Sequence, residues 1–191
     1  MNENSDRRRD ALRLRTERLE LVAATLEMAR ANGNDPAELA HLLTAALPSE
    51  WPPPLNDRES AQWLIERLSH EPSAVGWLMW FFVREDAESR IVIGNGGFKG
   101  RPVLGTIEVG YSIVPEFQRK GYASEAVGAL LEWAFFQAPV VRVIAETLPD
   151  LVPSQRLLRK LGFRAAGAGS EAGIIRFELS KEELQQDRAH E

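Results

Sequence analysis

The sequence predicts an α+β fold, with one mixed, mostly antiparallel and twisted sheet that carries helices on both faces. Two observations predict it. Helical patterns dominate the first third of the chain, and strand patterns joined by short turns follow. The last part then alternates strand, helix, strand, helix and strand. At 191 residues, the chain has the length of one domain with a well-buried core.

The N-terminal third is expected to form one strand and three helices. Apolar and polar residues alternate over 14–22, which indicates a strand, and the polar residues 1–13 before it are expected to be a disordered or frayed tail. The helices are expected at 24–32, from Asp35-Pro36 to about 47, and from a cap at Asn56 or Asp57 to about 69. Trp51 and the three prolines after it predict a stiff loop, either a lid over a substrate site or a packed connection.

The remaining chain is expected to supply the main sheet. Apolar and β-branched runs predict strands at 77–83, 90–98, 106–114, 140–147, 163–166 and 174–179. Helical spacing predicts two helices, at 124–136 and 153–161. Because a crossover between strands of one sheet is right-handed, the strands on either side of the first helix are expected to be parallel.

Two features of these strands predict close packing. Gly94, Gly96 and Gly97 weaken the strand at 90–98 and indicate a bulge or a close backbone contact. The dense aromatic run at 77–82 resembles a pocket wall, but a place in the core is the expected one.

Composition excludes several classes of protein. The chain has no cysteine, so it has no disulfide and no cysteine nucleophile, and its net charge of −5 makes nucleic acid an unexpected partner. No apolar run is long enough to span a membrane, and residues 1–10 lack the apolar core of a signal peptide, so we expect a cytoplasmic protein. His41, His70 and His190 lie far apart without ligand spacing, so no metal site is expected.

The segment 118–124 carries the most informative pattern. Its basic turn, which includes Arg119, Lys120 and Gly121, joins the strand at 106–114 to the start of the helix at 124–136. The first amides of a helix have no partner within it, and the helix dipole makes that end electropositive. Gly121 lets the backbone approach a ligand closely. The turn is therefore predicted to hold a pyrophosphate.

Four blocks of sequence follow one another in a characteristic order. They are Leu-Arg-Thr-Glu-Arg-Leu at 14–19, Glu-Val-Gly-Tyr at 108–111, Gln-Arg-Lys-Gly-Tyr-Ala-Ser-Glu-Ala at 118–126, and Ser154 with Leu-Leu-Arg-Lys-Leu-Gly-Phe at 157–163. Together they resemble the Gcn5-related N-acetyltransferases, specifically the branch that acetylates ribosomal-protein N-termini. The resemblance implies acetyl-CoA as co-substrate and a primary amine as acceptor, either a protein N-terminus or a small molecule. It also implies that the strands at 107–114 and 140–146 splay apart around the pantetheine arm.

The resemblance implies a set of site residues. The cofactor-binding positions are Ile113, Val114, Gln118, Arg119, Lys120, Gly121, Tyr122, Ala123 and Ser124. Glu108 is the candidate base, or else a strand residue paired with a cation, and an amide near Ile113 or Val114 is the candidate oxyanion donor. Ser154 is a candidate donor to the leaving sulfur, with helix capping as the alternative. Tyr111 is either an acid or a core aromatic residue, with core packing favoured.

One departure from the family pattern affects the expected chemistry. The family usually has Asn three residues before the Ser, and this chain has Leu151 there, with the polar Asp150 beside it. A non-catalytic acyl-CoA-binding or regulatory module of the same fold is therefore the rival interpretation. The expected acetyltransferase domain covers 14–181, followed by a tail at 182–191, in a monomer or homodimer. The acceptor itself cannot be read from the sequence.

Overall fold

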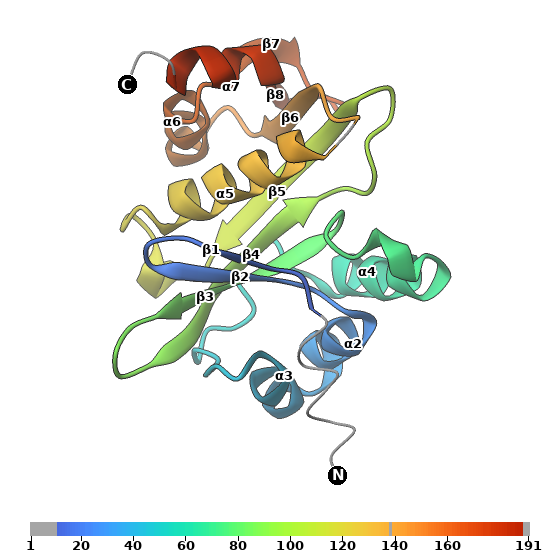
Figure 1. Ribbon diagram of the computed structural model, residues 1–191, viewed down its shortest axis with the longest axis vertical. Helices are drawn as coiled ribbons and strands as arrows, with labels where there is room; N and C mark the ends of the chain where they lie inside the picture. Colours follow the sequence, from blue (N-terminus) through green and yellow to red (C-terminus); the bar gives the residue numbers. More distant parts are fainter. Residues whose placement is uncertain (1–10, 138, 189–191) are drawn as a thin grey trace.

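The computed structural model describes residues 11–137 and 139–188, in which one eight-stranded sheet carries helices on both faces (Figure 1). The strands are β1 (Arg13–Arg15), β2 (Leu19–Ala23), β3 (Met79–Glu85), β4 (Arg90–Phe98), β5 (Thr106–Ile113), β6 (Arg142–Thr147), β7 (Arg164–Ala168) and β8 (Ile175–Ser180). Their order in the sheet is β1-β2-β3-β4-β5-β6-β8-β7. Every neighbouring pair is antiparallel except β5 and β6, which are parallel. The predicted fold class and the predicted parallel pair are confirmed.

The predicted helices are found in the predicted order with shifted ends, and one helix that was not predicted follows them. The predicted ones are α2 (Leu26–Asn34), α3 (Pro36–Leu43), α4 (Arg58–His70), α5 (Tyr122–Phe136) and α6 (Val152–Lys160), and the one that was not predicted is α7 (Lys181–Arg188), with short 3₁₀ turns at Pro72–Ala74 and Pro115–Phe117. Side chains of Thr25, Asp35 and Asp57 cap the first three. Of the two predicted candidates for the cap of α4, Asp57 is therefore the one that caps it. The side chain of Asn56 instead accepts a hydrogen bond from Asn95 Nδ2 at 2.7 Å.

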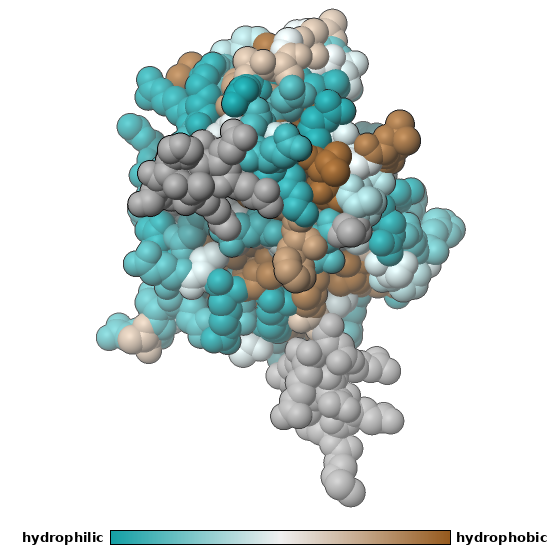
Figure 2. Space-filling view, turned by 45° about the horizontal axis from the view of Figure 1, so that its top comes forward, coloured by the Kyte–Doolittle hydropathy of each residue, from teal (hydrophilic) through white to brown (hydrophobic). Residues whose placement is uncertain are grey.

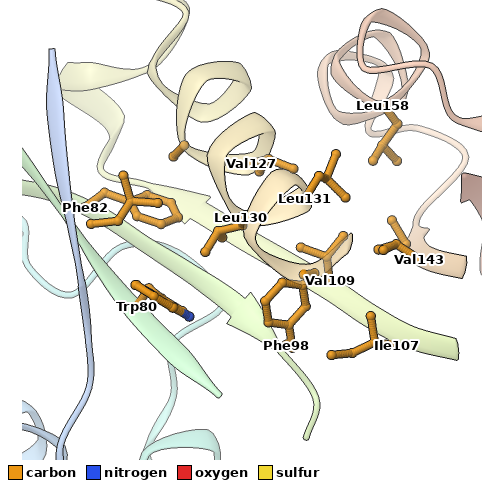
Figure 3. Packing of buried hydrophobic residues seen from close by; sticks show 14 of the residues in the cluster. Trp80, Phe82, Phe98, Ile107, Val109, Val127, Leu130, Leu131, Val143 and Leu158 are labelled. Carbon is orange, nitrogen blue, oxygen red and sulfur yellow. The ribbon is translucent and has the colours of Figure 1, made fainter. Parts of the chain in front are cut away.

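Hydrophobic clusters on the two faces of the sheet make a three-layer arrangement. One cluster packs α5 and α6 against the strands, and Figure 3 shows Val127, Leu130 and Leu131 of α5 beside strand residues such as Val109. The other cluster packs α2, α3 and α4 against the opposite face. Each face of the sheet is thus fixed by its own set of helices.

The aromatic run at 77–82 belongs to these cores, as expected. Trp80, Phe81 and Phe82 are completely buried, and Trp77 is 9% exposed. The ring of Trp133 on α5 lies 4.9 Å from that of Trp77 and 5.4 Å from that of Trp80, between centroids. These rings anchor α5, and with it the turn at its N-terminus.

The glycines of β4 make close backbone contacts, as predicted. A Cβ atom at Gly94 would collide with the carbonyl oxygen of Ser112, and one at Gly97 would collide with that of Leu78. The register between β3 and β4 also shifts at Phe82/Val83, which is the expected irregularity. The glycines let β3, β4 and β5 lie together without side chains between their backbones.

Two segments differ from the prediction in kind and not only in their ends. The single strand expected at 14–22 is a hairpin of β1 and β2, because Thr16 Oγ1 accepts from Leu19 N–H at 3.0 Å and closes a turn. The tail expected at 182–191 begins as helix α7, which Ser180 and Glu183 start with reciprocal side-chain bonds to each other's amides. Residues 1–10 and 189–191 of the expected tails lie outside the described residues.

The surface carries hydrophobic residues mainly at loops and helix ends. Figure 2 shows a face on which small hydrophobic areas are interrupted by hydrophilic side chains. The most exposed large hydrophobic residues in the described ranges are Leu104, Phe136, Leu55 and Val103. No helix within 11–137 or 139–188 is long and apolar enough to cross a membrane.

Candidate active site

The parallel strands β5 and β6 separate part-way along their length. They pair from Thr106 with Arg142 to Glu108 with Ile144, and no further. On its other side β5 stays paired with β4 as far as Ile113. The edge of β5 beyond Glu108 is therefore open toward β6, which confirms the predicted splay.

The sheet determines which backbone groups point into this gap. Lys99 N–H donates to the Glu108 carbonyl, and Val114 N–H donates to the Ile93 carbonyl of β4. Because the backbone groups of successive residues point to opposite edges of a strand, those of Val109, Tyr111 and Ile113 point toward β6. Apart from the Ile113 carbonyl, which accepts from the Gln118 side chain, these groups are available to pair with an extended ligand as another strand would.

The same pattern decides between the two predicted oxyanion donors. The amide of Val114 is already used in the sheet, at 2.9 Å from the Ile93 oxygen. The Val114 N–H is therefore not free to meet a ligand, and the Ile113 amide is the one that faces the gap. Sequence alone did not separate the two because the register with β4 was unknown.

The turn before α5 has the geometry expected of an anion site. Gly121 is the N-cap residue, with φ of 85°, and no side chain caps the helix. Within the part of the chain that the structure describes, no hydrogen bond is found from the amides of 119–124. Arg119 also has a positive φ, of 61°, so the turn reverses sharply just before the helix. Several amides with unused donors thus gather at an electropositive helix end.

The side chains of the turn have different surroundings. Gln118 Nε2 donates to the Ile113 carbonyl at 2.8 Å, so this side chain ties the turn to the end of β5. Arg119 and Lys120 are exposed, and Lys120 Nζ lies 5.5 Å from the centre of the Phe117 ring. Residues 122–124 form the first turn of α5 and are half-buried. The backbone amides of the turn can bind a phosphate, with the exposed cations of Arg119 and Lys120 beside them.

Glu108 lies on β5 at the last paired position before the gap. Its carboxylate forms an ion pair with Lys99 Nζ, a contact that the sequence analysis allowed as the alternative to a base but did not assign to a residue. The Glu108 side chain is 20% exposed and that of Lys99 is 63% exposed. The partner is therefore a solvated cation that can move away from the carboxylate.

Tyr111 and Ser154 join β5 to α6 across the gap. Their hydroxyl oxygens lie 2.9 Å apart, and either can donate to the other. Burial raises the pKa of Tyr111 above its ordinary value, with the bond from Ser154 partly opposing this, so the phenol is neutral at neutral pH. Capping by Ser154 is wrong as an alternative, because the N-cap of α6 is Leu151.

Leu151 occupies the cap position without capping. It makes no side-chain bond to the helix and is 41% exposed. Gln155 Nε2 instead bonds the carbonyl of Pro149 at 2.8 Å, which holds the loop before α6. No contact of the Asp150 side chain is found within the described residues that would let it replace an amide at this position.

The Trp51 loop lies on the face of the sheet that carries Glu108. Side chains alternate along a strand, so Glu108 and Ser112 share one face of β5 and Tyr111 lies on the other. Ser112 Oγ donates to the Pro54 carbonyl at 2.7 Å, and Trp51 Nε1 donates to Asn32 Oδ1 at 2.9 Å. The loop is thus fixed at both ends against the sheet and α2, and it walls one side of that face.

A metal centre finds no support in the described residues. Within 11–137 and 139–188, no three or more His, Cys, Asp or Glu side chains gather where they could hold an ion. His190, one of the three histidines, lies outside these ranges.

Comparison of the sequence with protein families identifies the family to which this arrangement belongs. Residues 14–164 match the model of the acetyltransferase (GNAT) domain. The chain belongs to this acetyltransferase family. The match starts in the β1–β2 hairpin and ends at the start of β7, so it includes the diverging strands and the turn before α5.

Curated relatives in this family come from Bacillus subtilis (strain 168). The uncharacterized N-acetyltransferase YjdG is 30% identical over 151 residues, which are 78% of this chain and 88% of YjdG. The uncharacterized N-acetyltransferase YnaD is 44% identical over 62 residues, which are 32% of this chain. That match spans only about a third, 36%, of the length of YnaD.

Solved structures share the fold at lower identity. The ribosomal-protein-S5-alanine acetyltransferase from Vibrio fischeri has a TM-score of 0.60 and 20% identity, over 91% of this chain and 98% of that one. The microcin C7 self-immunity acetyltransferase MccE, in complex with acetyl-CoA and AMP, has a TM-score of 0.57 and 16% identity. This likeness covers 86% of this GNAT chain and 93% of MccE.

Proposed function

We propose that this GNAT protein transfers an acetyl group from acetyl-CoA to a primary amine, on a protein N-terminus or a small molecule, by direct attack of the amine. The observation that carries the proposal is the combination of the open edge of β5 with the unused amides at 119–124. Both lie at the C-terminal end of one strand, so a single extended ligand with a pyrophosphate fits the two together.

The residues present fit acetyl-CoA. The amides of 119–124 would hold its pyrophosphate, with Arg119 and Lys120 adding positive charge. Backbone groups of Tyr111 and Ile113 would pair with the amides of its pantetheine arm in the gap between β5 and β6. The complex of MccE with acetyl-CoA shows that a protein of this fold holds that molecule.

Protein groups on the two sides of β5 would divide the chemistry. Acetyl-CoA, when bound, supplies an activated acetyl thioester. Glu108, directly or through water, would take the proton that the amine loses as its nitrogen bonds the acetyl carbon. A backbone N–H of β5 that faces the gap would donate to the carbonyl oxygen as charge develops there. Ser154 Oγ would donate to the sulfur as the carbon–sulfur bond breaks, on the opposite side of the strand.

The rival is a non-catalytic acyl-CoA-binding module. Two observations favour it: Leu151 stands where the family usually has Asn, and the Glu108 carboxylate already has Lys99 as a partner. The retained hydroxyl pair of Tyr111 and Ser154 favours the enzyme, because a binding module has no need of a donor beside the thioester.

Release of free thiol from acetyl-CoA separates the two functions. The acceptors would include peptides that begin with Ala, which the name of the Vibrio fischeri neighbour motivates, together with polyamines and amino acids. Amine-dependent thiol release supports the enzyme. Tight CoA binding without release for every amine supports the module. A cytoplasmic location, where acetyl-CoA is available, is part of the same proposal.

A further inference from the structure

The turn of the β1–β2 hairpin lies against the first turn of α5, more than a hundred residues away along the chain. Glu125 receives hydrogen bonds from Thr16 Oγ1 at 2.5 Å, from Arg18 N–H at 2.8 Å and from Arg18 Nε at 2.7 Å. Arg18 Nη2 also lies 2.7 Å from Glu125 Oε2, so two nitrogens of the guanidinium share this one carboxylate oxygen. The guanidinium of Arg18 is therefore held in one orientation.

That guanidinium reaches over the backbone of the predicted phosphate turn. Arg18 Nη1 donates to the Lys120 carbonyl at 3.0 Å, and the guanidinium carbon lies 4.5 Å from the centre of the Tyr122 ring. A Cβ atom at Gly121 would lie 3.3 Å from Arg18 Nη2. One side chain thus contacts three successive residues at the point where the turn becomes a helix.

The bond to Lys120 has a geometric consequence for the ligand site. The Lys120 carbonyl and the Gly121 N–H belong to the same planar trans peptide, so they point in opposite directions. When Arg18 holds the carbonyl on the hairpin side, the Gly121 N–H is turned to the other side, away from the hairpin. The carbonyl oxygen, which would repel a phosphate, is kept out of the site at the same time.

We propose that Arg18 is a positioning residue for the pyrophosphate of the co-substrate, and that Glu125 and Thr16 hold it in place. Arg18 acts on the ligand through the Lys120–Gly121 peptide. A fixed peptide has less freedom to lose on binding, so the turn binds more tightly than a mobile one would. The inference rests on the proposed function.

The test compares Arg18→Met with Arg15→Met, which removes the same charge from the same hairpin but whose side chain is 74% exposed and contacts Glu20 instead. By calorimetry, Arg18→Met should weaken CoA binding by about tenfold or more, the scale of one charged hydrogen bond. Arg15→Met should stay within about twofold of the wild type. The same weakening is expected with 3′-dephospho-CoA, which keeps the pyrophosphate.

Acetyl-pantetheine, a thioester donor without phosphates, gives the readout that a merely structural role would not produce. Its kcat/KM should be the same for Arg18→Met as for the wild type, while KM for acetyl-CoA rises about tenfold. Equal losses with both donors, or unchanged CoA affinity in folded Arg18→Met, would overturn the inference. A wild type that binds no CoA would instead overturn the proposed function.

Two more variants complete the test. Arg18→Lys keeps the charge, but a single ammonium group cannot reproduce both guanidinium contacts with Glu125 and the bond to the Lys120 carbonyl. Its CoA affinity should therefore be as low as that of Arg18→Met. Full rescue by Lys would show that charge alone matters and would contradict positioning. Should Arg18→Met fail to fold, Glu125→Gln replaces it in the test, since it weakens the hold on Arg18 while it keeps the shape of the side chain. Glu125→Gln should also weaken CoA binding, and unchanged CoA affinity in this variant would overturn the inference.

Discussion

The hydroxyl oxygens of Tyr111 and Ser154 lie 2.9 Å apart and connect β5 to α6 across the gap between β5 and β6. Tyr111 is placed by the sheet and Ser154 by a helix, so the distance between them fixes the width of the gap at this point. Ser154 has no capping duty, because Leu151 is the N-cap residue of α6. The pair is therefore a local probe of the proposed chemistry.

Removing each hydroxyl separately tests that chemistry. Ser154→Ala and Tyr111→Phe break the same hydrogen bond, so each should lower the free energy of unfolding by about 1 kcal/mol. Only Ser154→Ala removes the donor proposed for the sulfur, and it should lower kcat by about 10²-fold, the scale for loss of one positioned donor. Steady-state kinetics with acetyl-CoA measure kcat for the two variants, and chemical denaturation measures their free energies of unfolding. Equal, small losses of kcat would show that the pair is only structural.

Glu108 calls for a variant that keeps the shape of the side chain. Glu108→Gln should lower turnover by about 10²- to 10⁴-fold if the carboxylate takes the proton of the amine, with little change in acetyl-CoA affinity. Lys99→Met is the matched control, because it breaks the same ion pair from the other side. If both variants lose the same small amount of activity across the pH range, Glu108 is a paired strand residue and has no role as a base.

Gly121 tests the phosphate turn directly. Its φ of 85° disfavours any other residue, so Gly121→Ala should cost about 1 kcal/mol of stability while leaving the turn open. Gly121→Trp carries the same backbone strain and also fills the space before the helix, so it should abolish CoA binding measured by calorimetry. Unchanged CoA affinity in a folded Trp variant, or a crystal with CoA bound elsewhere, would exclude the turn as the site.

The stability of the hairpin side of the sheet should depend on pH. Burial raises the pKa of Glu20, but the hydrogen bond from Arg90 and the charges of Arg13, Arg90 and Arg15 outweigh it and lower the pKa below its ordinary value. A lowered folded pKa stabilises the fold above the unfolded pKa of about 4.3, and this contribution is lost as the pH falls through the folded value.

Melting temperatures between about pH 7 and pH 3 check this dependence. Glu20→Gln should cost about 1–3 kcal/mol at neutral pH, because three partly exposed arginines lose a carboxylate whose side chain is only 3% exposed. Its melting temperature should fall less steeply with acid than that of the wild type. Glu88→Gln, at an exposed position in the β3–β4 turn, should change neither the stability nor the slope.

Local signals explain what the sequence predicted well. The turn at 118–124 is recognisable because Gly121 and the basic residues lie next to each other between two strongly patterned elements. The parallel pairing of β5 and β6 follows from the handedness of crossovers. The capping box of Ser180 and Glu183 was an equally local signal for α7, and reading it would have corrected the expected tail.

Long-range contacts explain what the sequence did not predict. Tyr111 and Ser154 are 43 residues apart, and Arg18 and Glu125 are 107 apart. Their meeting depends on strand register and on where α5 and α6 settle, which no local pattern encodes. Glu125 lies in the first turn of α5, where a carboxylate suits the helix dipole, and four contacts from the hairpin turn give it a second role. The partner of Glu108 likewise depended on the β4–β5 register.

Leu151 is the residue at which stability and activity can be separated. As the N-cap of α6 it makes no side-chain bond, so Asn at this position should supply one. Leu151→Asn should therefore raise the free energy of unfolding by about 1 kcal/mol, and the melting temperature by about 2–4 °C. Leu151→Ser offers the same cap without an amide group and is the matched control. Thermal unfolding should show both gains.

Turnover per folded molecule then shows what Leu151 does for the acceptor. The side chain is 41% exposed at the mouth of the gap, where an apolar group can contact a bound acceptor, so we expect Leu151→Asn to lower turnover with the best amine. Leu151→Ser should lower it as well, because it also removes the apolar contact. Higher turnover on generic amines for Asn alone would instead show that the natural Leu weakens the site. A wild type that releases no thiol with any amine would favour the binding module.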